Sequence, residues 1–99
     1  MAIISRHYWR PEHIDKFVKC HREFHDYHLK NAGAVDMKLY KHDSDSTLYI
    51  ADVFFDSWSD KDKWDEYFKT NTSVQEFAKR INETAEGLNK KEYLHVIDY

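Results

Sequence analysis

Cysteine, proline and glycine are all scarce in this chain. Its 99 residues include one Cys, one Pro and two Gly. The lone Cys20 cannot form an internal disulfide, which excludes a disulfide-rich secreted scaffold and favours a reducing compartment. So little Pro and Gly excludes collagen, low-complexity disorder and linker-rich arrays. We therefore expect a globular, cytoplasmic protein.

Long apolar runs and blocks of one charge are also absent from the sequence. No apolar stretch approaches the roughly 18 residues of a transmembrane helix, and the apolar start at residues 2–4 is too short for a secretory signal. Lys and Arg total 15 against 18 Asp and Glu, a net charge of -3. We therefore expect neither a membrane nor a nucleic acid as partner.

Aromatic residues, in contrast, are abundant. They make up 16% of the 99 residues, a length that suits one domain spanning 1–99. A domain of this size buries only about two thirds of the surface of its unfolded chain. Large aromatic side chains are therefore expected to supply much of the core, and some of them could contact a ligand or a partner.

The first half of the chain predicts a strand, a helix and a hairpin. Residues 2–10 are rich in β-branched and aromatic types and precede a proline, as expected of a first strand. Apolar residues then recur at helical spacing over residues 12–31, and Gly33 follows where a left-handed helix end is favoured. Two β-rich runs, 35–42 and 48–55, flank a cluster of turn-forming residues and predict the hairpin.

The second half predicts a broken helix and a last strand. Ser57 begins a weak capping box, and aromatic residues on one helical face follow it. A polar break at 71–72 precedes Ser73, which begins a second capping box, and helical spacing continues to Leu88. The alternating tail 92–99 predicts a fourth strand.

The order β, α, β, β, α, β predicts an α+β, ferredoxin-like split βαβ fold, with a four-stranded antiparallel sheet and both helices on one face. Neighbouring strand residues such as Ile3 and Ile4, or Phe54 and Phe55, are large and apolar at both parities. A half-solvated sheet would alternate instead. A second copy could cover the other face by two-fold symmetry, so we predict a homodimer that forms a dimeric α/β barrel.

Residues 52–81 carry the most specific sequence pattern. They read DVFFDSWSDKDKWDEYFKTNTSVQEFAKRI: a strand ending in an acidic residue, a cap with Trp and Ser, an aromatic helix, a polar break, and a helix with a Phe. This order resembles the antibiotic biosynthesis monooxygenase-like proteins of the dimeric α/β barrel superfamily. The resemblance implies cofactor-independent oxidation of an aromatic, polyketide-like substrate by O₂. Other members degrade haem, cyclise polyketides or have no assigned activity.

Two departures weaken a transfer of the haem-degrading and cyclase activities. The haem-degrading branch has an iron-ligating His on its second helix, where this chain has Phe77 and Ala78. The cyclase branch has a His after the polar break, and residues 70–74 contain none. The monooxygenase-like activity is therefore the preferred interpretation, with no cofactor. The alternative is a non-catalytic dimeric module that binds a small molecule or a metal.

Three histidines lie close together in the first predicted helix. His21, His25 and His28 are spaced four and three apart, in the middle of the apolar stripe that includes Phe17. Buried imidazoles need hydrogen-bond partners. Tyr hydroxyls, polar sheet residues or waters could provide them, which would make the three residues purely structural. Alternatively, His21 and His25 could pair with a strand residue such as His7 or His95 around a metal ion.

The preferred interpretation places a ligand cavity between this helix and the sheet. His21 and His25 are then the predicted catalytic residues, acting as acid-base groups on the ligand. No metal site is included in this prediction. Five further residues are predicted to contact a small-molecule substrate: His7, Trp9, His28, Trp64 and Tyr67.

Overall fold

The computed structural model describes residues 2–99, apart from the side chain of Asn89. The elements in chain order are β1 (Ile3–Pro11), α1 (Ile14–Tyr27), β2 (Asp36–Lys41), β3 (Tyr49–Phe55), α2 (Trp58–Thr70), α3 (Thr72–Thr84) and β4 (Ala85–His95). The strands form one four-stranded sheet in the order β2-β3-β1-β4, and every neighbouring pair is antiparallel. This is the predicted ferredoxin-like arrangement, so the predicted fold class is confirmed.

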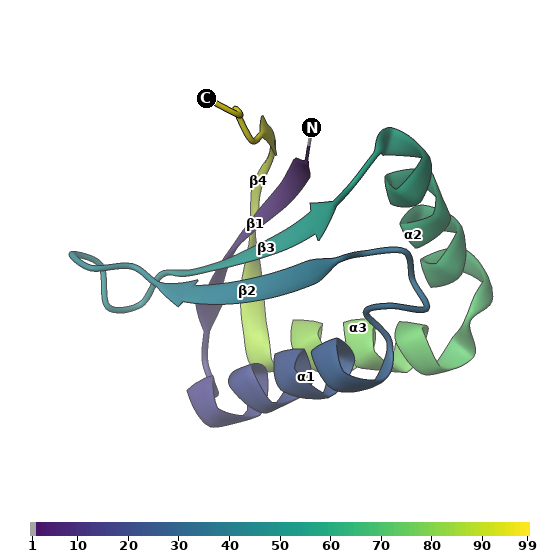
Figure 1. Ribbon diagram of the computed structural model, residues 1–99. Coiled ribbons are helices and arrows are strands. Elements are labelled where there is room, and N and C mark those ends of the chain that lie inside the picture. Colours follow the sequence, from purple (N-terminus) through teal and green to yellow (C-terminus); the bar gives the residue numbers. More distant parts are fainter. Residues whose placement is uncertain (1) are drawn as a thin grey trace.

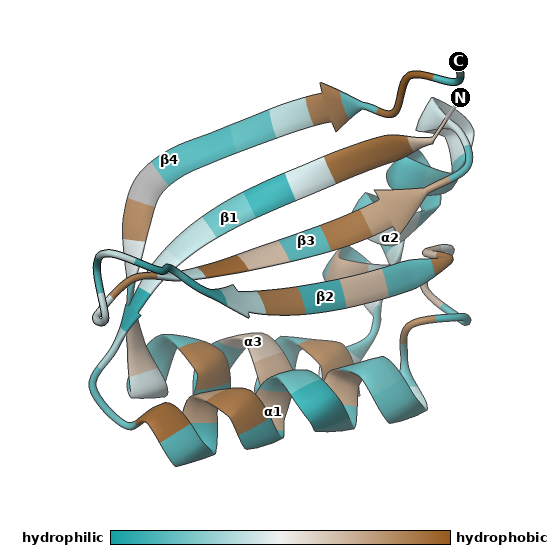
Figure 2. Ribbon diagram, turned by 60° about the vertical axis from the view of Figure 1, so that its left-hand side comes forward, coloured by the Kyte–Doolittle hydropathy of each residue, from teal (hydrophilic) through white to brown (hydrophobic). Residues whose placement is uncertain are grey.

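The helices all lie on one side of the sheet. In Figure 1, α1 and α3 run side by side below the strands, and α2 stands at one end of the sheet. Figure 2 shows the same two layers from another side, with the opposite face of the sheet uncovered by any helix. No helix of residues 2–99 is long and apolar enough to cross a membrane.

Strand alternation divides the residues of β1 between the two faces of the sheet. Ile3 and Ser5 are buried, and with His7 and Trp9 they face the helices. Arg6 faces the opposite, outer side and forms a two-pronged ion pair with Asp52 of β3, with both N–O distances at 2.8 Å. Asp52 is 1% exposed although no helix covers its face, because strand neighbours and the guanidinium enclose it.

Helix α1 is shorter than the sequence predicts. It ends at Tyr27 instead of continuing to about residue 31. Leu29 is 4% exposed and belongs to the core, together with Ala34, so the chain turns to bury it. Gly33, with φ +95°, closes this turn. The predicted left-handed glycine is therefore present, but it ends the loop before β2 and not the helix itself.

The predicted break between the two later helices is confirmed at Asn71. Ser57 caps α2 by accepting a hydrogen bond from the backbone N–H of Asp60 at 3.2 Å, as the capping box predicts. The cap of α3 differs from the prediction. Asn71, and not Ser73, accepts from the N–H of Val74 at 3.1 Å. The helix therefore begins at Thr72, immediately after the break.

The prediction that helical structure continues to Leu88 is wrong. Helix α3 ends at Thr84, whose carbonyl oxygen accepts hydrogen bonds from the backbone N–H groups of Glu12 and His13. Strand β4 begins at Ala85, opposite Pro11 of β1. Pairing with β1 therefore overrides the local helical periodicity. At the other end, β4 stops at His95 instead of continuing to the last residue.

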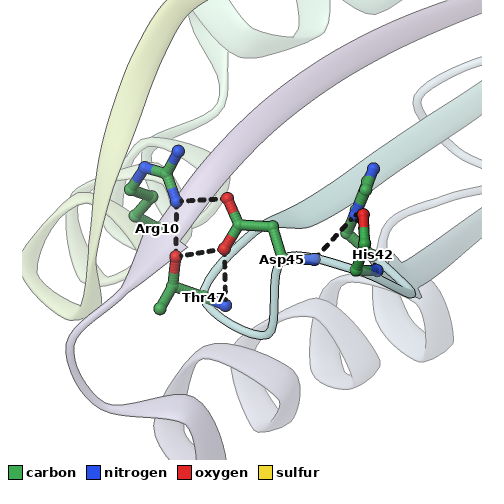
Figure 3. Close-up of polar contacts among 5 residues, drawn as sticks. Arg10, His42, Asp45 and Thr47 are labelled. Carbon is green, nitrogen blue, oxygen red and sulfur yellow. Dashed lines mark hydrogen bonds and ion pairs between the residues drawn. The ribbon is translucent and has the colours of Figure 1, made fainter.

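A network of hydrogen bonds links the loop between β2 and β3 to the end of β1 (Figure 3). Arg10 donates to Asp45 Oδ2 at 3.0 Å and also to the Thr47 hydroxyl. Asp45 Oδ1 accepts from the Thr47 hydroxyl at 2.7 Å, while the Asp45 N–H donates to Nδ1 of His42 at 3.0 Å. Hydrogen bonds from Thr47 and Arg10 lower the pKa of Asp45 to about 2. This hairpin end is thus fixed by charge-assisted bonds.

Candidate functional site

A cavity of about 310 Å³ lies between the sheet and the helices. The sheet contributes its helix-facing residues, and each of the three helices contributes a side. Its lining residues are His7, Trp9, Met37, Ala51 and Val53 from the strands, and His21, Phe24, Trp64, Asp65, Phe68, Ala78, Ile81 and Asn82 from the helices. The volume is at the lower end of the range of small-molecule sites. A mostly apolar, aromatic lining with a few polar groups is typical of such sites.

His21 is the polar residue that α1 contributes to this cavity. It is buried, and its Nδ1 lies 2.9 Å from the carbonyl oxygen of Phe17, one helical turn earlier. A carbonyl oxygen only accepts, so Nδ1 carries the proton and Nε2 of the neutral ring carries a lone pair. Every fully buried side-chain nitrogen among the described residues has a hydrogen-bond partner, whereas none of these residues bonds Nε2 of His21. Nε2 is therefore accessible to solvent.

Burial keeps the His21 ring in its neutral form. Desolvation lowers the pKa of His21, and the bond from Nδ1 to the Phe17 carbonyl offsets this only in part. Its ring centroid lies 4.4 Å from that of Phe17, which is fully buried. Packing and hydrogen bonding thus fix the ring and leave one nitrogen as an acceptor.

His7 is the polar residue that the sheet contributes. Its Nε2 lies 3.2 Å from the hydroxyl oxygen of Ser5, its neighbour on the same face of β1. Desolvation, followed by the positive charges of Lys91 and Lys61, lowers the pKa of His7 to about 4. The cavity therefore holds two neutral imidazoles near pH 7, one from β1 and one from α1.

Aromatic rings form much of the remaining wall. Phe24 of α1 lies 5.3 Å from Trp64 and 5.6 Å from Phe68, both of α2, measured between ring centroids. Trp64 also lies 5.5 Å from Phe55 of β3. These spacings are those of well-packed aromatic pairs. The wall is thus both part of the core and an apolar, aromatic surface beside the cavity.

Two more polar side chains, from α2 and α3, reach the cavity. Asp65 accepts a hydrogen bond from the buried ammonium of Lys61 at 2.5 Å, so its charge is compensated. Asn82 uses its NH₂ group to donate to the Ala78 carbonyl at 2.9 Å, which leaves its side-chain oxygen as an acceptor. The lining therefore contains hydrogen-bonding groups and no uncompensated cation, an arrangement suited to a neutral ligand.

The structure brings together four of the residues predicted to form the site. His7, Trp9, His21 and Trp64 all line the cavity. His25 does not, because its side chain is 46% exposed and lies beside Asp26 and Asp36. His25 instead lines a separate surface groove together with His21 and Leu39.

His28 and Tyr67 lie away from the cavity and close to each other. Nδ1 of His28 is 3.3 Å from the Tyr67 hydroxyl, and the His28 ring also packs against Phe77 at 5.0 Å between centroids. His28 follows α1 as its C-terminal cap, where the chain departs from the helical path. The two side chains therefore lie within hydrogen-bonding distance of each other between the helices, outside the cavity.

Several lining residues were not predicted. Phe68 belongs to the aromatic cluster of α2 that the sequence already indicates. Asp65 and Asn82 carry weaker signals, because exposed and buried polar residues at helical spacing look alike in a sequence. Ile81 belongs to the apolar spacing of its helix, which predicts burial and not a cavity. The residues described also contain no group of three or more His, Cys, Asp or Glu arranged to hold a metal ion.

No family model and no curated protein sequence matches this chain. Solved structures do match. SnoaB, a cofactor-independent oxygenase of Streptomyces nogalater, has a TM-score of 0.77 at 6% identity, covering 99% of this chain and 95% of that protein. A candidate antibiotic biosynthesis monooxygenase of Caulobacter crescentus has a TM-score of 0.77 at 13% identity, covering 98% and 91%.

A NIPSNAP family protein of Agrobacterium tumefaciens is also similar, with a TM-score of 0.74 at 13% identity, covering 100% of this chain and 96% of that protein. Identities this low establish the fold and leave the activity to be argued from the site. The chain has the ferredoxin-like fold of the antibiotic biosynthesis monooxygenase-like proteins, as its residues 52–81 indicated.

Proposed function

We propose that this protein is a cofactor-independent monooxygenase-like enzyme that oxidises a small aromatic or polyketide-like substrate with O₂. The observation that carries the proposal is the pairing, in one cavity, of a fixed imidazole acceptor on His21 with an aromatic wall that includes Trp64. The similarity in fold to a cofactor-independent oxygenase supports it. The wall holds a planar ring, and the imidazole acts on its acidic proton.

In the proposed reaction, Nε2 of His21 removes a proton from the carbon that lies next to the phenol or enol system of the substrate. The resulting carbanion donates electrons to O₂, and a substrate hydroperoxide forms. Loss of water from this hydroperoxide leaves a carbonyl group on the same carbon. One oxygen atom of O₂ thus enters the product and the other leaves as water, so a CH₂ group supplies all the electrons and no external reductant is needed.

His7 has a supporting role in this proposal. It carries no charge near pH 7, so it can donate or accept one hydrogen bond toward a substrate oxygen without adding a cation to the cavity. Because burial also lowers the pKa of His21, its protonated form is a stronger acid than an ordinary imidazolium. The substrate proton must therefore be acidic, as it is in anthrones and other phenol-conjugated methylene compounds.

Oxygen uptake with anthrone as the probe tests the proposal. We expect the purified protein to consume O₂ and form anthraquinone in equal amounts, without added metal or flavin. The His21→Gln variant, which keeps a polar side chain of similar reach, should lose this activity. Equal rates of O₂ uptake for the two proteins would reject His21 as the base. If wild type consumed O₂ no faster than buffer alone, the oxygenase proposal would be rejected.

We also propose that the protein is a homodimer that joins through the outer face of the sheet. This face carries Ile4, Ile50, Phe54 and Leu94, and no helix of residues 2–99 covers it. A two-fold axis would place a second sheet over these apolar side chains.

The buried, free Cys20 suits a reducing compartment, so we propose that the protein is cytoplasmic.

The second candidate function is a non-catalytic dimeric module that binds a small molecule in the same cavity. One observation favours it: both cavity imidazoles have lowered pKa values and suit hydrogen bonding better than proton uptake. Thermal shift with phenolic probes separates the two candidates. A ligand that raises the melting temperature but is never oxidised supports the binding module.

A further inference from the structure

The indole of Trp9 lies directly against the backbone of Gly87, its partner across β1 and β4. A Cβ atom added at Gly87 would be 3.2 Å from Cζ3 of Trp9 and 3.6 Å from both Cε3 and Cη2. The first distance is shorter than an ordinary carbon–carbon contact. Any larger residue at position 87 therefore requires the indole to move.

The shape of β4 explains why the indole reaches this position. The pairing between β1 and β4 shifts in register between His7 and Trp9, and Figure 2 shows that the first part of β4 bends down toward α3. Such irregularities bend a strand and redirect its side chains. The bend brings Gly87 against the ring of Trp9, and the missing side chain leaves room for it.

On its other side, Trp9 faces residues that cannot give way easily. Its ring centroid lies 5.9 Å from that of Phe17, which is fully buried and packs in turn on His21. Tyr49 of β3, the partner of Trp9 across the sheet, is buried in the same cluster and lies 6.0 Å from Phe17 between ring centroids. Because these neighbours are tightly packed, the open direction for a displaced indole is the cavity that Trp9 itself lines.

We propose that Gly87 determines the size of the ring system that the cavity admits, by letting Trp9 lie against β4. Gly87 is then a specificity-determining position that does not touch the ligand and acts through Trp9. The inference rests on the proposed function only for its ligand class, a neutral phenolic ring, and it does not require turnover.

Calorimetric titration with two probes, phenol and 1-naphthol, tests this inference. Wild type should bind both. The Gly87→Ala variant should lose about tenfold in affinity for 1-naphthol, the larger probe, with little change for phenol, because a small loss of volume excludes the second ring first. Adding Trp9→Phe, which shortens the indole to one ring, should restore binding of 1-naphthol.

The neighbouring substitution Glu86→Ala is the matched control, since Glu86 lies on the same strand and is exposed; it should leave both affinities unchanged. Equal losses for the two probes, no recovery with Trp9→Phe, or a wild type that binds neither probe would each overturn the inference. Size-selective binding without oxygen uptake would reject the oxygenase and retain the role of Gly87.

Discussion

Nδ1 of His21 donates its proton to the carbonyl oxygen of Phe17 at 2.9 Å, which fixes the orientation of the imidazole within α1. The carbonyl is also part of the helix backbone, so it keeps a hydrogen-bonding role if the imidazole is removed. The bond therefore matters more for the tautomer of the ring than for the stability of the helix. It leaves Nε2 as the acceptor on which the proposed chemistry depends.

The first prediction follows from this relationship. We expect His21→Ala to lower the free energy of unfolding by about 1 kcal/mol, through lost packing on Phe17. Oxygen uptake should fall by about 10²-fold or more, because a general base is removed. Urea denaturation and an oxygen electrode measure the two effects. His13→Ala, at an exposed position without a side-chain cap bond, is the control. A large stability loss with unchanged ligand binding would show that His21 is only structural.

The second prediction concerns pH. The pKa of His7 is about 4 in the folded protein and 6.5 as its ordinary value, so the unfolded chain takes up a proton first as pH falls. Stability is therefore full above about pH 6.5 and decreases toward pH 4, by at most about 3 kcal/mol. Denaturant melts across this range should show the loss. The loss of stability should be smaller for His7→Gln. An equal loss in both proteins between pH 6.5 and pH 4 would contradict the burial of His7.

The third prediction concerns the ion pair of Arg6 and Asp52. Asp52→Asn should destabilise the fold by about 2 to 3 kcal/mol, because it weakens both bonds to a guanidinium whose pKa the carboxylate raises. Thermal unfolding measures the change. As a comparison, Arg10→Gln removes an ion pair whose partners are both over one-third exposed, and it should cost much less. Similar losses in the two variants would argue against a special role for the buried pair.

The fourth prediction tests the proposed dimer. Light scattering should give about twice the 12.0 kDa mass of one chain. Phe54→Glu, on the outer face of β3, should yield monomers with a lower melting temperature. Ile14→Glu places the same charge on the exposed side of α1 and should leave the mass unchanged. A natively folded wild type of single-chain mass at micromolar concentration would reject the dimer.

The strand and helix order could be predicted because the periodicities of this sequence are strong and its polar break at Asn71 is unambiguous. The start of β4 could not. Residues 85–88 continue the helical spacing of α3, and only their pairing with β1 shows that they form a strand. Helix α1 ends early for a similar reason, since burial of Leu29 is a tertiary effect that local spacing does not encode.

The site was partly predictable. Alternation along β1 places His7 and Trp9 on one face, and the apolar stripe of α1 places His21 toward the sheet. His25 lies on the same stripe in a helical projection, but near the edge of the sheet the stripe meets solvent. The contribution of α3, including Asn82, depends on how the helices pack, and spacing alone does not fix that.

The alternation of β1 makes the two proposed roles of the sheet inseparable. Odd-numbered positions face the helices, where His7 and Trp9 line the cavity, and even-numbered positions face outward. An insertion or deletion of one residue in this strand would therefore exchange the two sets. Arg6 would then enter the ligand site and His7 would leave it. The length of this strand is therefore under a double constraint: a shift of one residue would disrupt both the proposed ligand cavity and the proposed dimer interface.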